Sequence, residues 1–312
     1  MITKKTVLVL GAGASIPFGF PSGKKLVALI ADMINGDSVT VKLLMNHGYD
    51  KEYIWEFRKS LVLSGRFSVD EFLEYRNEFI DVGKEAIAAV LLRFEQTMNL
   101  FNVREESNWY QYLFGQLNTS FDEFNQNKIA IITFNYDRSL EHYLFTALKN
   151  AYNKNGEECA EKLNKIPVVH VYGKLGKLPW EKSQYSLVPF DSVIYPDKMG
   201  LYVGRGGENI KIIHENIEKD PEFNQAFELL MDAEYIYFLG FGFNETNLKR
   251  LRIESLCHPD VPLKVICGTS YGLSQKLFKI VNGYRKTPNR LIDLYPQKIH
   301  DFLYNNPEVY LG

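Results

Sequence analysis

Short, unbroken runs of apolar residues recur along the chain, and each ends in glycine or in polar side chains. TVLVL at residues 6–10 leads into GAGAS, and KIAIIT at residues 128–133 leads into FNYD. IPVVHVYG, EYIYFLGFGFNE and PLKVICGTS repeat the pattern later in the chain. Runs of this length and branching are typical of buried parallel strands. We therefore expect five such strands, with PLKVICGTS as the last.

Between these runs, apolar residues lie three and four positions apart, which predicts helices. KKLVALIADMI follows the first strand, SLEHYLF the second, and NQAFELLMDA and TNLKRLRIESL flank the fourth. The many Pro and Gly residues of 176–208 predict a loop-rich segment there. The alternation predicts an α/β protein with a Rossmann-like parallel sheet and helices on both faces.

Residues 38–125 have a different pattern, with many charged and aromatic residues and few strand signals. VDEFLEYRNEF, GKEAIAAVLLRFEQTMNLF and NWYQYLFGQL all have helical spacing. We predict a helical insertion subdomain of four to six helices at 38–125, within a sheet domain formed by residues 1–37 and 126–312. Its aromatic stripe is interpreted as core rather than as a ligand site.

Composition and charge exclude several classes of protein. The 312 residues are 46% hydrophobic and 24% charged, with a net charge of -2, so no overall field attracts nucleic acid or a membrane. A basic bias between Lys249 and Lys298 is interpreted as a solvated face, which leaves direct nucleic-acid contact open. The three cysteines form no CxxC pair, which argues against a four-cysteine zinc site or a disulfide framework. With no apolar run long enough for a membrane helix near the start, we expect a soluble, cytoplasmic protein.

The ends of the predicted strands carry the candidate chemistry, because ligands of parallel sheets bind beyond the carboxyl ends of the strands. In GAGAS, Gly11, Ala12 and Gly13 would let the backbone approach a phosphate. Ser15 would add a hydroxyl near the start of the next helix. Ile16 stands where the dinucleotide fingerprint GxGxxG has its third glycine, and no GK[ST] follows, so the loop is neither a dehydrogenase fingerprint nor a P-loop. A tight turn without a ligand is the alternative.

Polar side chains at the ends of the second and third strands are candidates for catalysis. Asn135 can donate and accept hydrogen bonds at once, and turn chemistry is its alternative explanation. Asp137 is either a functional carboxylate or the cap of the next helix, and Thr133 a substrate contact or a plain strand residue. His170 is a natural general base or a satisfied core histidine. Strand alternation places Tyr172 on the same face as His170.

Taken together, these motifs resemble those of the sirtuin-like superfamily over residues 5–35 and 128–270. GAGAS with FGFPSG is similar to its glycine motif, and TFNYD to its Thr-Gln-Asn-Ile-Asp motif. HVYGK resembles the strand end that carries the catalytic His, and YFLGFGFNETNL the strand end that meets the adenosine half of NAD. The four zinc-binding cysteines are absent, and PFGFPSG replaces the acidic and arginine-bearing turn after the first helix start. Tyr172 rather than a His precedes the motif glycine.

With these departures, the chain resembles the bacterial sirtuin-like NAD hydrolases of anti-phage defence. The resemblance implies cleavage of the nicotinamide–ribose bond of NAD+, which is the substrate, with no other cofactor and no metal. It implies that Asn135 orients the ribose or the attacking water, that Asp137 stabilises developing positive charge or holds Asn135 in place, and that His170 or Tyr172 is the base. The residues implied to seat the dinucleotide are Gly11, Ala12, Gly13, Ser15, Thr133, Tyr172, Gly240, Gly242, Asn244 and Thr269.

A non-catalytic sensor of NAD or ADP-ribose, or a structural subunit that recruits a nucleic-acid motor, is the main alternative function. A protein deacylase is disfavoured by the missing zinc module, and a dehydrogenase by Ile16. Because unregulated NAD hydrolysis would kill the host cell, we expect a closed site that a trigger opens. The helical insertion is the expected assembly or lid surface of a homo-oligomer. A partner ATPase or a phage component is the expected trigger.

Overall fold

A single parallel sheet organises the protein. The structure is a computed structural model that describes residues 1–102, 104–105, 107–181, 186–212, 220–256, 258, 260–274, 292–306, 309 and 311. Over these residues the strands are ordered β3-β2-β1-β4-β5-β6, and every pair is parallel. This is the doubly wound order, whose switch point lies between β1 and β4. The predicted Rossmann-like α/β fold is confirmed.

The five predicted strands form where the apolar runs place them. They are β1 (Thr6–Leu10), β2 (Ile129–Thr133), β3 (Val168–His170), β4 (Tyr235–Leu239) and β5 (Val265–Thr269). A sixth strand, β6 (Ile292–Tyr295), was not predicted. Within the described part of the chain it pairs with β5 alone, so its sequence, IDLY, need not be continuously apolar. Residues 275–291 of the basic stretch, and Cys257, lie outside the described residues.

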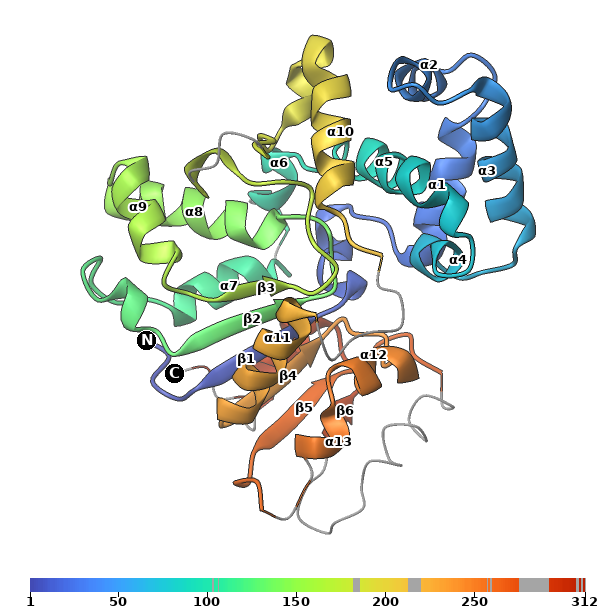
Figure 1. The fold of residues 1–312 in the computed structure, drawn as a ribbon. Helices are drawn as coiled ribbons and strands as arrows, with labels where there is room; N and C mark the ends of the chain where they lie inside the picture. Colours follow the sequence, from blue (N-terminus) through green and yellow to red (C-terminus); the bar gives the residue numbers. More distant parts are fainter. Residues whose placement is uncertain are drawn as a thin grey trace.

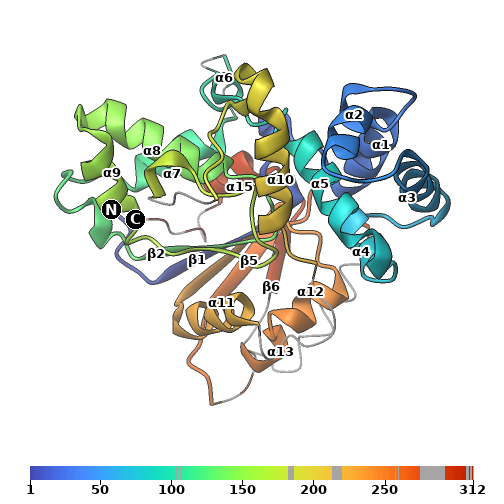
Figure 2. The ribbon, with the colours of Figure 1, turned by 45° about the horizontal axis from the view of Figure 1, so that its top comes forward.

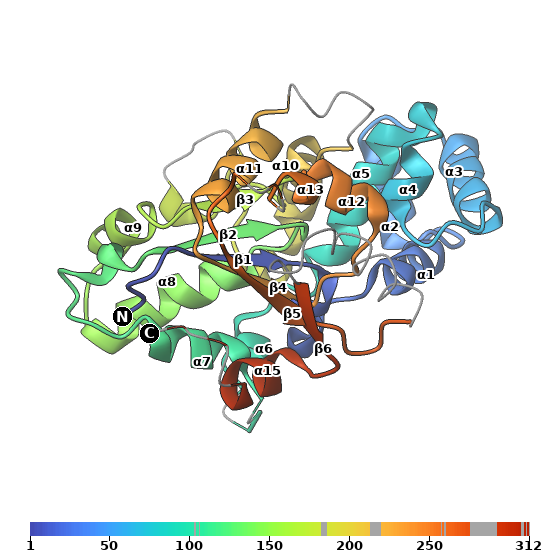
Figure 3. The ribbon, with the colours of Figure 1, turned by 90° about the horizontal axis from the view of Figure 1, so that it is seen from below.

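Helices cover both faces of the sheet (Figures 2 and 3). On one face lie α7 (Trp109–Gln116), α8 (Ser139–Tyr152), α9 (Gly156–Leu163) and α15 (Ile299–Asn305). On the other face lie α11 (Pro221–Asp232), α12 (Glu245–Arg250) and α13 (Ile253–Leu256). Side chains at the end of one strand therefore meet different helices according to the face toward which they point.

The segment 38–125 is helical, as its periodicity predicts. It contains α2 (Val39–Asn46), α3 (Lys51–Leu63), α4 (Val69–Leu73), α5 (Ile80–Leu91), α6 (Thr97–Leu100) and α7. The rings of Phe57, Phe72 and Phe79 are buried against one another, so the aromatic stripe is core as predicted. In the packing, α1 (Gly23–Met33) joins α3 and α5, whereas α7 joins α8 and α15. Figure 1 places α1 to α5 beside the carboxyl ends of the strands.

One helix contradicts the loop-rich prediction for residues 176–208. MGLYVGRGGEN forms α10 (Met199–Asn209), which packs along α5. A Cβ added at Gly206 would lie 3.1 Å from the Ala88 Cβ, and one at Gly207 would lie 2.9 Å from the Glu85 Cγ. The glycines that lower helix propensity thus permit a close contact between helices, and tertiary packing outweighs propensity.

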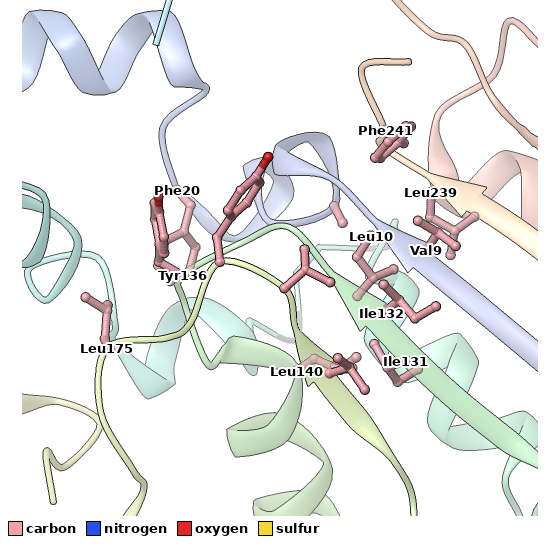
Figure 4. Close-up of a cluster of buried hydrophobic side chains, with 14 of the residues drawn as sticks. Val9, Leu10, Phe20, Ile131, Ile132, Tyr136, Leu140, Leu175, Leu239 and Phe241 are labelled. Atoms are coloured by element: carbon pink, nitrogen blue, oxygen red, sulfur yellow. The ribbon is translucent and has the colours of Figure 1, made fainter. Parts of the chain in front are cut away.

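The core of the sheet lies directly under the carboxyl ends of its central strands. Figure 4 shows Leu10 of β1 and Ile132 of β2 side by side, with Leu239 of β4 next to them. All three side chains are at most 3% exposed. This packing fixes the strand ends, so the polar residues that follow project from a rigid base.

Candidate active site

The loops after β1 and β4 meet at the switch point through backbone contacts that require glycine. The Gly13 N–H donates to the Gly240 carbonyl at 2.9 Å. A Cβ added at Gly11 would lie 2.6 Å from the Gly240 oxygen. Gly240 has a φ of +59°, and its added Cβ would lie 2.3 Å from the Ala14 nitrogen. These glycines are therefore needed to pack the two loops together, whatever else they bind.

The GAGAS loop differs from the expected helix start. Two 3-10 turns, Ala12–Ala14 and Ile16–Phe18, follow β1, and the first α-helix begins only at Gly23. Ser15 therefore stands at the start of a short 3-10 helix rather than of an α-helix, because Pro17 and the left-handed Gly19 shape a short turn there. The N–H groups of Gly11, Gly13, Ala14 and Ser15 already donate to backbone carbonyls.

Asn135 is fixed in one orientation at the end of β2. Its Nδ2 lies 3.0 Å from the Gly11 carbonyl oxygen and 3.0 Å from the Ser15 Oγ. Because a carbonyl oxygen only accepts hydrogen bonds, the amide nitrogen must face Gly11. The Asn135 Oδ1 is thereby turned away, and within the described residues it accepts no hydrogen bond. The side chain is partly exposed, so this oxygen is an acceptor at the carboxyl edge of the sheet.

His170 lies behind Asn135 and contacts it directly. The Nδ1 of His170 is 2.9 Å from the main-chain oxygen of Asn135, and its Nε2 is 2.7 Å from the Glu141 Oε1. Both His170 and Glu141 are 7% exposed. Burial disfavours ionisation of Glu141, but the charges of His170 and Lys174 outweigh it and lower the Glu141 pKa to about 2.

Sequence reasoning missed Glu141, although a signal was present. Glu141, Leu144 and Leu148 are spaced i, i+3, i+7 and share the buried face of α8. A carboxylate on the apolar face of a helix predicts a hydrogen-bonding or cationic partner, because an unpaired buried charge is costly. That partner comes from β3, which the sequence does not place beside α8.

Tyr172 points away from His170, which corrects the expectation that the two share a face. β3 ends at His170, so strand alternation does not extend to Tyr172. The Tyr172 ring packs against Phe223 of α11, and its hydroxyl is 2.7 Å from the Asn247 Oδ1 on α12. Burial raises the pKa of Tyr172 well above its ordinary value, even though the Arg250 guanidinium opposes the shift.

Asp137 faces the interior on the α8 side of the sheet. Its Oδ1 accepts the Ser139 N–H at 3.1 Å and also contacts the Ser139 hydroxyl, but the N-cap position of α8 is Arg138, so Asp137 forms a local turn just before the helix rather than its cap. Burial raises its pKa. Asp137 lines a small cavity with Thr133, Asn135, Ser139 and other residues, and the cavity has room for about one water molecule.

Residues predicted to contact the adenosine half of NAD form hydrogen bonds within the protein. The Thr269 Oγ1 accepts the Gly240 N–H at 2.9 Å, which ties β5 to the loop after β4. The Asn244 Oδ1 accepts the Thr246 N–H at 2.8 Å and caps α12. An added Cβ at Gly242 would meet nothing within 4 Å. The structure thus gathers Gly240 and Thr269 beside the GAGAS loop, whereas Gly242 and Asn244 are exposed.

Helix α4 reaches the same strand ends from the helical segment, which the sequence did not indicate. The Asp70 carboxylate accepts a hydrogen bond from the hydroxyl of Tyr136, the residue after Asn135. One turn later, the Glu74 Oε1 lies 2.9 Å from the NH2 group of Arg250, whose NH1 group donates to the Tyr172 hydroxyl. Loss of solvation raises the pKa of Asp70 to about 6.

Comparison with known proteins gives no family for this chain. No protein-family model matches it, and no curated protein matches it in sequence. Within the part of the chain that the structure describes, no helix combines the length and apolarity needed to cross a membrane. The structure itself defines the class: a doubly wound α/β protein with a polar cluster at the carboxyl ends of β1, β2 and β3.

Proposed function

We propose that this protein is an NAD+ hydrolase that cleaves the nicotinamide–ribose bond. The observation that carries the proposal is the fixed orientation of the Asn135 side-chain amide. Asn135 stands at the carboxyl edge of a doubly wound sheet, where dinucleotides bind, and its amide is fixed so that an acceptor oxygen remains for a ligand. The resemblance of GAGAS, TFNYD and HVYGK to sirtuin-like motifs supports NAD+ as the dinucleotide.

The reaction consumes one water molecule and releases one proton. The bond between ribose C1′ and the nicotinamide nitrogen breaks, and its electron pair leaves with nicotinamide. The ribose becomes oxocarbenium-like, water adds to C1′, and ADP-ribose forms. In this scheme the Asn135 Oδ1 accepts a hydrogen bond from a ribose hydroxyl or from the attacking water, which holds the reacting groups in one geometry.

Of the two candidate bases, only His170 contacts Asn135. The raised pKa of Tyr172 keeps its phenol protonated at neutral pH, so it is a poor proton acceptor. The carboxylate of Asp137 faces the interior, where it stabilises the start of α8 and adds negative potential beneath the proposed ribose position.

We further propose that the enzyme depletes NAD+ as an effector of anti-phage defence, in which a trigger relieves a closed state. The contacts of Asp70 with Tyr136 and of Glu74 with Arg250 support a gating role for α4, because the first joins the helical segment to the residue after Asn135 and the second joins it to α12. Assembly into a homo-oligomer, and activation by a partner ATPase or a phage component, belong to this proposal.

Nicotinamide release from NAD+ tests the activity directly. We expect Asn135→Ala to lower release by at least about 100-fold, because misplacement or loss of one positioning group has effects of this size. Asn135→Asp should fail equally, since a carboxylate cannot donate to the Gly11 carbonyl. Asn150→Ala, on the exposed side of α8, is the matched control and should retain full activity. Equal release by the Asn135 variants and the wild type would reject the proposed site.

A non-catalytic sensor of NAD+ or ADP-ribose is the second candidate. The pairing of both His170 nitrogens with acceptors favours it, because no ring nitrogen is left to accept a proton. A sensor predicts that NAD+ raises the melting temperature of the wild type without nicotinamide release, and that Asn135→Ala abolishes this rise. If NAD+ neither stabilises the protein nor is cleaved, both functions are excluded for the isolated chain.

A further inference from the structure

The hydrogen bonds of His170 determine its protonation state in this structure. Its Nδ1 faces the Asn135 carbonyl oxygen, which can only accept, so Nδ1 carries a proton. Its Nε2 faces the Glu141 carboxylate, which also accepts when ionised. A neutral imidazole has one N–H and could satisfy only one of these partners. Two donated hydrogen bonds therefore indicate an imidazolium, provided that Glu141 is an anion.

The surrounding charges favour that anion. The Glu141 Oε1 lies 3.4 Å from the Lys174 Nζ as well as 2.7 Å from the His170 ring. Lys174 in turn lies 2.6 Å from the Glu181 Oε1. Cation and anion thus alternate from His170 to Glu181, and the row has no net charge. Asp137, the other acid near the start of α8, contacts the N–H and hydroxyl of Ser139.

We propose that Glu141 is a positioning residue: it keeps His170 as a cation whose Nδ1–H holds the main-chain carbonyl of Asn135, so that His170 orients Asn135 and does not act as the base. The inference rests on the proposed function for its catalytic meaning. Its structural part, the charged state of His170, stands on the contacts alone.

The chemistry of the proposed reaction is compatible with a site that has no strong base. Nicotinamide leaves as a neutral molecule, and the oxocarbenium-like ribose is reactive enough to capture water itself. The proton of that water can pass to solvent. The geometry of the capture then matters most, and the row from Glu141 through His170 to Asn135 fixes that geometry. Because Glu141 neutralises the imidazolium, no uncompensated positive charge opposes the forming cation.

The protonation state can be measured without any activity, by ¹⁵N NMR of the histidine rings at neutral pH. His170→Ala assigns the signal by its disappearance. We expect both His170 nitrogens to be protonated in the wild type. In Glu141→Gln the ring should become neutral, because the new amide can donate to Nε2 while Nδ1–H still donates to Asn135. Glu161→Gln, an exposed acid on α9, is the control and should leave the signal unchanged. A neutral His170 ring in the wild type would overturn the proposal.

Kinetics then separate orientation from proton transfer. For nicotinamide release we expect Glu141→Gln to lower kcat by about 10- to 100-fold with little change in KM, since the effect falls on alignment rather than binding. The wild-type rate should lack an acidic limb due to a histidine base, whereas a His170 base would lose activity as pH falls. Such a limb, absent in His170→Ala, would also overturn the proposal. If no nicotinamide is released at all, the hydrolase fails, but the NMR result still decides the pairing of Glu141 with His170.

Discussion

The two halves of the sheet present very different surfaces at their carboxyl ends. Beyond β1, β2 and β3, side chains form a dense polar cluster in which Asn135, His170 and Glu141 are linked one to the next. Beyond β4 and β5, the strand ends themselves are held by close backbone packing at Gly240, by the Thr269 hydroxyl on the Gly240 N–H, and by the cap at Asn244. In the doubly wound fold one half can thus supply chemistry while the other supplies shape.

The largest expected effect on stability tests the close packing between the loops after β1 and β4, where the two halves of the sheet meet. Gly240→Ala would place a Cβ 2.3 Å from the Ala14 nitrogen at a φ of +59°, where the backbone cannot yield without moving the GAGAS loop. We expect a loss of several kcal/mol in the free energy of unfolding, because it combines backbone strain with overpacking (roughly 3–5 kcal/mol). Chemical denaturation measures it.

Gly242→Ala is the matched control two residues away. Its added Cβ meets nothing within 4 Å, so we expect a change within about 0.5 kcal/mol. If the two alanine variants were equally stable, the close contact between the loops after β1 and β4 would not be what requires glycine in this half.

A smaller effect on stability is expected from the contact between Asp70 of α4 and Tyr136, which follows β2. The pKa of Asp70 is raised to about 6, so the folded protein holds its proton more tightly than the unfolded chain does. Its contribution to stability is therefore fully present below pH ~4 and is lost as pH rises to about 6. Asp70→Asn keeps an acceptor for Tyr136 but cannot ionise.

We expect the stability of the wild type, relative to Asp70→Asn, to fall by about 2 to 3 kcal/mol between pH ~4 and pH ~6, at about 1.4 kcal/mol per pKa unit. The difference should become constant only above about pH 7, one unit beyond the folded pKa. Thermal denaturation of both proteins across this pH range measures it. Parallel curves would mean that Asp70 ionises normally and that α4 rests on the site without a buried charge.

The smallest expected effect on stability concerns Asn244, which follows β4 in the other half of the sheet. Asn244→Ala removes the cap of α12 and should cost about 1 kcal/mol of stability, whereas Asn244→Asp retains a good cap and should cost little. Thermal denaturation separates the two variants. If NAD+ binding is measured alongside, equal affinity in both variants fits a capping residue. Weaker binding by both would make Asn244 a ligand of the adenosine side, as the sequence motif suggested.

Much of the fold followed from the sequence alone. The apolar runs of β1 to β5 and the helical spacing between them are local patterns, and they specify a doubly wound sheet because parallel strands need helical crossovers on both faces. The same patterns place Asn135 and His170 at strand ends. α10 shows the limit of local patterns, since its glycines favour a loop until α5 lies against them.

The tertiary structure decided what those side chains contact. Glu141 lies 29 residues from His170, and Asp70 lies 66 residues from Tyr136, so neither pairing has a signature in local spacing. Strand alternation also failed at Tyr172, because β3 stops at His170 and the chain then turns to the opposite face. The sequence by itself determined the strands β1 to β5 and the polar groups that end them, but not the edge strand β6. Only the packing of α8, α4 and α12 against those ends determined which groups are paired, because hydrogen bonds between distant segments depend on the relative position of whole elements.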